Sequence, residues 1–286
     1  MTPLLLAALA VLLSGPAPWL VLRFPELRQA PRAAMTLWQA VALAAVLAAL
    51  GAGLSLATGA VVAPGNSSSR AVAAGGVLVT AVVLARLLVS GHRVGTRLRS
   101  TRRSHRELVD LLGAEDSGVL VLEDPRPRAY CVPALTRSRV VVTAGAVERL
   151  HEDEVAAVLT HERAHLRARH DLVLEAFTVL HEAFPRIVSS VRALGEVKLL
   201  VEVLADRTAM RRHGRLPLAR ALVALSDGGA PETALAVTGS DLGTRIELLR
   251  DDRPRPVLAG ALYATALAVL ALPTVFLALP WLASLT

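Results

Sequence analysis

The sequence predicts a mainly α-helical membrane protein with four spans, and a soluble domain with a small β-sheet between spans three and four. The 286 residues are 53% hydrophobic, and their mean hydropathy is +0.51. This is too apolar for an ordinary soluble protein of this size. The apolar residues gather in four long blocks, whereas the segment between the last two blocks is rich in Arg and Glu and has helical periodicity.

Each apolar block is about as long as the ~20 residues that cross a hydrocarbon core. The blocks cover residues 3–22, 37–63, 72–90 and 257–285. The first block is expected to be a retained span rather than a signal peptide, because no Lys or Arg precedes it. The predicted division is residues 1–91 for three transmembrane helices, 92–255 for a cytoplasmic domain and 256–286 for the fourth transmembrane helix.

The distribution of basic residues predicts the orientation of the spans. The loop after the first span carries three Arg against Glu26, and six Arg follow the third span directly, at positions 93, 97, 99, 102, 103 and 106. The positive-inside rule then places the soluble domain in the cytoplasm, at the cell membrane, with both termini outside. The net charge of +7 is explained by topology and by attraction to anionic lipid, so direct nucleic-acid binding is not expected. The single Cys131 fits a reducing compartment. Arg86, inside the third block, is expected to extend towards the interface.

The soluble domain begins with an expected helix at residues 93–112. Short β-prone runs follow at 119–122, 129–132 and 139–143. They predict a small sheet, whose edge either pairs with an extended peptide or only supports the fold. Further helices are expected through residues 153–165, 172–180 and 194–211.

The most informative motif is His161-Glu162-Arg163-Ala164-His165. Residues four apart lie on one face of a helix, so both imidazoles can bind one Zn²⁺ while Glu162 reaches a metal-bound water. The preceding residues begin with acids, which favour a helix N-terminus, and continue as one apolar stripe at Val155, Val158 and Leu159. The pattern therefore predicts a helical zinc site with one ion per chain.

A catalytic zinc needs a third protein ligand and an open position for water. A metzincin would have a His six residues after His165, where this chain has Asp171, so that class is excluded. A Glu from a later helix remains. Glu202 is favoured, because Asp206 one turn later can accept a hydrogen bond from a ligand His. The competing acids are Glu175, Glu182 and Glu196.

Several segments together resemble the gluzincin membrane peptidases. They are residues 139–143, the acidic residues 152–154 at the expected helix start, residues 159–165, residues 169–171, and Glu202 with Ala205 and Asp206. Residues 245–249 are a weaker match. The arrangement of spans resembles the antirepressor peptidases of the BlaR/MecR type, and the HtpX and Ste24 groups share the catalytic segment. BlaR/MecR sensors carry a penicillin-binding domain after the fourth span, which this chain is expected to lack.

The residues and the resemblance imply a membrane-embedded zinc endopeptidase. Zn²⁺ on His161, His165 and Glu202 would activate water, and Glu162 would act as general base. The resemblance implies a protein substrate, either a cytoplasmic repressor-like regulator or the chain itself, in response to a signal in the membrane. A quality-control protease of the HtpX type is the nearest alternative. A non-catalytic membrane scaffold is the other, although a scaffold has no need of Glu162.

Overall fold

The computed structural model describes residues 2–62, 67–116, 118–134, 138–185, 190–226 and 242–283. It is mainly helical and contains one small sheet, as the sequence predicts. The chain divides into two compact units. The span unit comprises Met1–His92, Phe177–Glu196 and Arg255–Thr286, and the sheet unit comprises Arg93–Ala176 and Val197–Pro254.

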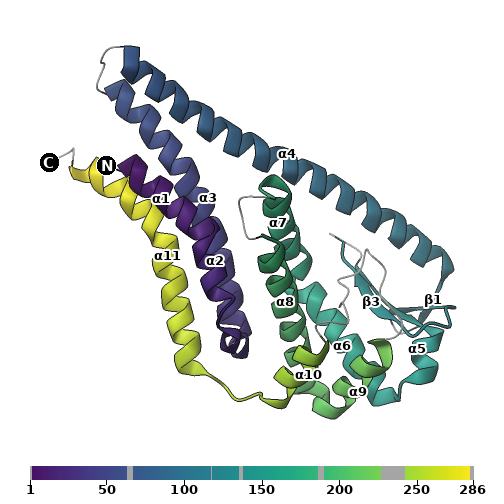
Figure 1. Ribbon diagram of the computed structural model, residues 1–286. Coiled ribbons are helices and arrows are strands. Elements are labelled where there is room, and N and C mark those ends of the chain that lie inside the picture. Colours follow the sequence, from purple (N-terminus) through teal and green to yellow (C-terminus); the bar gives the residue numbers. More distant parts are fainter. Residues whose placement is uncertain are drawn as a thin grey trace. The chain divides into compact units, whose positions relative to one another are not determined.

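Four helical segments of the described chain are long and apolar enough to cross a membrane, at Thr2–Val21, Pro31–Thr58, Arg70–Leu112 and Pro256–Ala278. All of them lie in the span unit except residues 93–112, which belong to the sheet unit. They belong to α1 (Thr2–Ser14) with α2 (Pro16–Val21), α3 (Pro31–Val62), α4 (Ser67–Leu112) and α11 (Pro256–Ala283), and the 3₁₀ helix η1 (Pro25–Gln29) precedes α3. Helices α1, α3 and α11 pack side by side (Figure 1). The predicted end of the second block at residue 63 and that of the fourth at 285 lie outside the described residues.

The facing ends of α7 (His170–Ala183) and α8 (Ser190–His213) also belong to the span unit. Three polar contacts hold them there. Arg86 Nε donates to the carbonyl oxygen of Ala183 at 2.7 Å, and Ser90 Oγ donates to that of Val179 at 2.8 Å. Arg28 forms a two-pronged pair with Glu196, at 2.6 and 2.8 Å. Arg86 thus satisfies a carbonyl in the last turn of α7, where a cation also complements the helix dipole.

The sheet unit is built on four strands in the order β1-β2-β4-β3, with β1 at Gly113–Asp116, β2 at Val119–Leu122, β3 at Ala129–Val132 and β4 at Arg139–Thr143. Strands β2 and β4 are parallel, and the other pairs are antiparallel. Because side chains alternate along a strand, Val141 packs with Val109 of α4 on one face, while Val140 and Val142 pack with Val158 on the other. Both faces of the sheet are therefore covered, and β1 and β3 are its edges.

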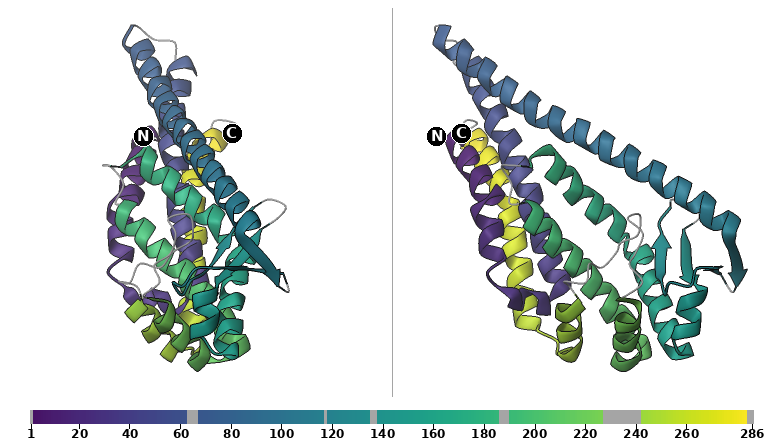
Figure 2. Two further views of the ribbon diagram at one scale, coloured as in Figure 1. Left: turned by 90° about the vertical axis from the view of Figure 1, so that its right-hand side faces the viewer. Right: turned by 45° about the vertical axis from the view of Figure 1, so that its right-hand side comes forward.

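The remaining helices are α5 (Ala144–Arg149), α6 (Glu152–Ala168), α9 (Arg215–Leu225) and α10 (Leu242–Arg250). Helix α6 lies beside the edge strand β3 (Figure 2). A second cluster of buried apolar residues joins α6, α8, α9 and α10, through Ala157, Ala209, Met210, Leu218 and Leu249. The core thus fixes α6 against the sheet on one side and against α8 on the other.

Candidate metal centre

Helix α6 carries both histidines of the motif on its buried face. Its first turn contains three acids, and the Glu154 carboxylate accepts a hydrogen bond from the His151 backbone N–H at 3.1 Å. This contact satisfies one of the N–H groups left free at a helix start. Ala157 and Ala164 are buried on the same side as His161 and His165, so the apolar face of α6 positions the two imidazoles in the interior.

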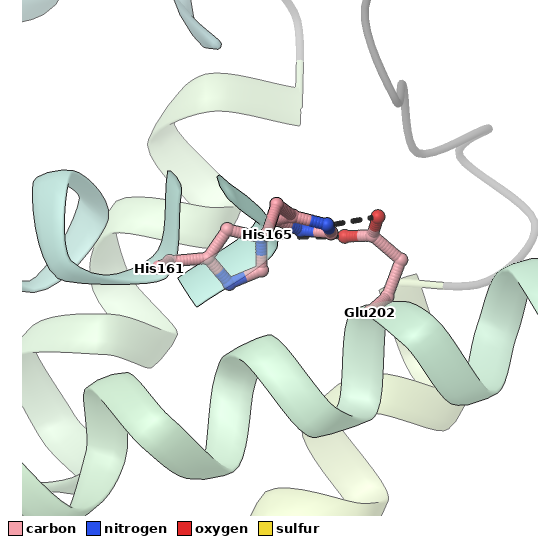
Figure 3. A group of neighbouring side chains, drawn as sticks. All are labelled: His161, His165 and Glu202. Carbon is pink, nitrogen blue, oxygen red and sulfur yellow. Dashed lines mark hydrogen bonds and ion pairs between the residues drawn. The ribbon is translucent and has the colours of Figure 1, made fainter. Parts of the chain in front are cut away.

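Helix α8 brings a carboxylate to these two imidazoles (Figure 3). The two Nε2 atoms of His161 and His165 are 3.0 Å apart. Glu202 Oε2 lies 3.4 Å from the first, and Glu202 Oε1 lies 3.5 Å from the second. All three side chains are buried. Within the part of the chain that the structure describes, these are the residues grouped closely enough to hold a metal ion.

The outer nitrogen of each imidazole has its own neighbour. His161 Nδ1 lies 2.9 Å from Asp206 Oδ1, and His165 Nδ1 lies 3.1 Å from His170 Nδ1. Asp206 and His170 are both buried. If each Nδ1 carries its proton and donates it outward, both Nε2 lone pairs face the same point.

Arg245 of α10 connects the two acids behind the imidazoles. Its Nε and Nη2 donate to Asp206 at 2.7 and 2.6 Å, and its Nη1 lies 3.2 Å from Glu202 Oε2. Only 1% of the Arg245 side chain is exposed. A fork-shaped guanidinium suits such bidentate pairing, so Arg245 fixes the orientation of both carboxylates.

A left-handed residue separates α6 from α7. Arg169 has φ of 51°, and it is the one non-glycine residue with positive φ among the described residues. Helix α6 ends at Ala168 and α7 begins at His170. This sharp turn lets His170 come back to within hydrogen-bonding distance of His165.

Glu162 is half-buried beside the histidines and accepts a hydrogen bond from the thiol of Cys131 on β3. Burial raises the pKa of Glu162 to about 7. Burial, followed by the nearby Glu162 charge, also raises the pKa of the Cys131 thiol far above its usual value. Glu162 can therefore both take and release a proton near neutral pH, and Cys131 stays a neutral thiol.

The two imidazoles differ in their pKa values without a bound cation. Burial lowers the pKa of His165 to about 3. Burial also opposes protonation of His161, but the hydrogen bonds to Asp206 and Glu202 outweigh it and raise the His161 pKa to about 10. Burial would raise the pKa of Asp206, yet the Arg245 charge lowers it to about 2. The centre thus attracts one positive charge, which is a proton when no metal ion is bound.

The donor set fits a zinc-type ion. Two imidazole nitrogens and one carboxylate oxygen are the ligands of a three-residue zinc site with an open fourth position. The three ligand atoms converge in a buried place, all within 4.8 Å of one another. Such an arrangement is costly unless a cation is shared between them.

The other acids considered from the sequence are engaged elsewhere. Glu175 pairs with Arg102 of α4 at 3.4 Å, and Glu196 pairs with Arg28. Glu182 is not in the group around the two histidines. Of these four acids, Glu202, the favoured one, is the acid that lies beside both imidazoles.

Sequence reasoning missed the contributions of Arg245, His170 and Cys131. Residues 245–249 resemble the family only weakly, and they give Arg245 no role at the site. A single Arg in a polar helix has no pattern that predicts its burial. His170 follows the motif closely, so its spacing was the available signal. Cys131 reaches the site through the sheet, which spacing alone cannot predict.

The fold and this centre define a protein class, which a family comparison identifies. Residues 96–252 match the family model described as Peptidase family M48, and this covers more than half of the chain. The chain therefore belongs to peptidase family M48 and is a metallopeptidase. No solved structure matches it.

Proposed function

We propose that this metallopeptidase is a zinc-dependent endopeptidase of the gluzincin type, in which His161, His165 and Glu202 hold the ion. The observation that carries this proposal is the convergence of two Nε2 atoms, 3.0 Å apart, with both Glu202 oxygens in a buried place. Asp206 and His170 hold the outer nitrogens of the two imidazoles, which favours the tautomers that a metal requires.

Glu162 is the general base of the proposed reaction. When bound, Zn²⁺ polarises the scissile carbonyl and lowers the pKa of water. Glu162 accepts the water proton and then donates it to the leaving amine. Its raised pKa, about 7, suits both transfers near neutral pH. The Cys131 thiol, which donates to Glu162, orients the carboxylate.

The proposed location is the cell membrane, with the sheet unit on the cytoplasmic side and both termini outside. The support comes from two Arg-rich segments, the loop after the first span and the residues directly after the third span. Both are expected on the same side, which the positive-inside rule makes the cytoplasmic side. The proposed substrate is a cytoplasmic regulatory protein, repressor-like by resemblance, or the chain itself. Strand β3 is an edge beside α6, so it can receive an extended peptide through main-chain hydrogen bonds.

The test compares the wild type with Glu162→Gln in purified, full-length protein in detergent. We expect zinc content to stay the same while cleavage of an unfolded protein substrate falls by about 10²–10⁴-fold, as for loss of a general base. The matched control is Glu107→Gln, which alters an exposed acid paired with Arg103 and should leave cleavage unchanged.

Two results would contradict the proposal. One is cleavage at the wild-type rate in Glu162→Gln, and the other is wild-type protein that contains no metal and is insensitive to chelators. Self-cleavage is separated from cleavage of another protein by mixing inactive Glu162→Gln chains with active ones. Cutting of the inactive chain shows that one copy can be the substrate of another.

A further inference from the structure

The span unit contains a partly open cavity of about 260 Å³. It is bounded by α1 and α2, by α3, by Val83 of α4 and by the facing ends of α7 and α8. Three alanines of α3 open the space, because positions 42, 45 and 49 follow one another on one helix face where larger side chains would fill it. Phe177 and Leu180 of α7 close the opposite side.

The lining of this cavity is apolar. Its one hydroxyl belongs to Ser14, which already donates to the carbonyl oxygen of Val11 at 3.2 Å. No Asp, Glu, Lys, Arg or His contributes to the lining. Water needs two or more polar partners to occupy such a place, and an empty space of this size is destabilising. The cavity therefore suits an apolar occupant.

The position and length of the cavity identify the source of that occupant. The lining residues of α3 run from Trp38 to Ala49, about 16 Å along the helix. One leaflet of a hydrocarbon core is about 15 Å deep. The α3 segment belongs to a helix that is apolar and long enough to cross a membrane. An acyl chain of a membrane lipid thus has both the required chemistry and the required length.

Basic residues lie close to one end of the cavity. Arg32 is exposed six residues before Trp38, about 9 Å away along the same helix. Arg23 is exposed, and its guanidinium lies 3.6 Å from the ring centroid of Trp19, next to the lining residue Pro18. Exposed guanidinium groups at the end of a span attract anionic headgroups. The occupant is therefore a lipid with a negative headgroup rather than a neutral one.

We propose that this cavity binds one acyl chain of an anionic membrane phospholipid, whose headgroup lies beside Arg23 and Arg32. The chain enters between the spans and fills the space against α3, α7 and α8.

A lipid bound in this cavity also affects the metal centre, a consequence that rests on the proposed function. Helix α7 runs from His170 to the lining residue Phe177, about 10 Å away along the helix. Helix α8 runs from the lining residue Ala193 to Glu202, about 13 Å away. A lipid that holds the apolar ends of both helices thereby supports two residues of the metal centre.

The experiment uses the full chain in vesicles that contain phosphatidylglycerol with a photoreactive diazirine on one acyl chain. After irradiation, labelled peptides are mapped by mass spectrometry. We expect label on residues 38–49 of α3 and on residues 177–184, which comprise the end of α7 and Phe184, and at least a fivefold loss in Ala45→Phe, which fills the cavity. The matched control is Ala268→Phe on the exposed face of α11, where labelling should be unchanged.

Ala49→Leu is a milder filling variant that serves if Ala45→Phe does not fold. Equal labelling of the cavity peptides in the wild type and in a folded filling variant would overturn the proposal, as would cross-linking of a polypeptide there. A phosphatidylcholine probe should label about fivefold less, because each basic residue contributes modest attraction to an anionic headgroup. Equal labelling by both probes would refute the anionic headgroup. Lipid labelling does not depend on proteolysis, so failure of the peptidase proposal leaves this test unaffected.

Discussion

Arg245 has the largest fully buried side chain in the described part of the structure. It neutralises Asp206 and Glu202, and together the three groups form a closed network with His161. Removing one member of a buried ion pair leaves an uncompensated charge, which costs far more than the pair itself contributes. The metal centre therefore depends on a residue that cannot bind a cation.

Replacement of Arg245 tests this dependence. We expect Arg245→Met to destabilise the protein by about 3–5 kcal/mol, because a buried carboxylate loses its partner, and to weaken zinc binding by about 10–100-fold. Chemical unfolding and competition with a zinc chelator measure the two effects. Arg250→Met, at the exposed end of the same helix, should behave as wild type. Wild-type zinc affinity in Arg245→Met would contradict this role.

Metal binding should also release a proton. The pKa of His161 is about 10 without a cation, so at pH 7 its imidazole is protonated, and that proton must leave before a metal can bind. Below its pKa, the His161 imidazole holds a proton that competes with zinc for the same nitrogen. Zinc affinity should therefore rise with pH from 6 to 9, by about tenfold per pH unit. Titration calorimetry in buffers of different ionisation enthalpy should report about one proton released. A pH-independent affinity would contradict the prediction.

At the scale of the element, local pattern predicted most of the fold. Helices α6 and α8 and strands β2, β3 and β4 have clear periodicity, and all are present. Strand β1 was not predicted, because its sequence Gly-Ala-Glu-Asp has no β-branched residue. Its strand conformation comes from antiparallel pairing with β2, which is a contact that composition does not encode.

At the junction between α6 and α7, glycine and alanine should have opposite effects on stability at positions 169 and 167. Arg169 is left-handed, and there a Cβ atom is unfavourable while glycine is accepted. Arg169→Gly should therefore be more stable than Arg169→Ala by about 1 kcal/mol. Arg167 lies within α6, so Arg167→Gly should be less stable than Arg167→Ala by about 1 kcal/mol. Urea unfolding of the four variants measures both differences, and equal signs would refute the backbone argument.

At the scale of the whole molecule, hydropathy predicted four apolar helices, and four are present in the described chain. Hydropathy did not predict that residues 177–196 group with the spans. Their membership depends on contacts such as Arg28 with Glu196, whose partners are 168 residues apart in sequence. The contact between Arg245 and Asp206, 39 residues apart, was missed for the same reason. Long-range pairing of single charges leaves no periodic pattern in a sequence.

The proposed orientation is tested by fusing reporters to the chain at Ser68 and Gly113. The Arg-rich flanks predict that a reporter at Ser68 lies outside and one at Gly113 lies in the cytoplasm. Alkaline phosphatase is active only outside and a fluorescent protein only inside, so the pair reports both sides. The reverse pattern at both positions would place the sheet unit outside and overturn the cytoplasmic assignment.

The order of these residues along the chain also affects biosynthesis. A ribosome makes both histidines and both acidic residues well before it reaches α10. Until then, Asp206 and Glu202 have no guanidinium to neutralise them, and their burial is unfavourable. A nascent chain therefore gains a finished centre only after α10 has been made. We therefore expect ribosome-bound chains that stop before α10 to show no peptidase activity.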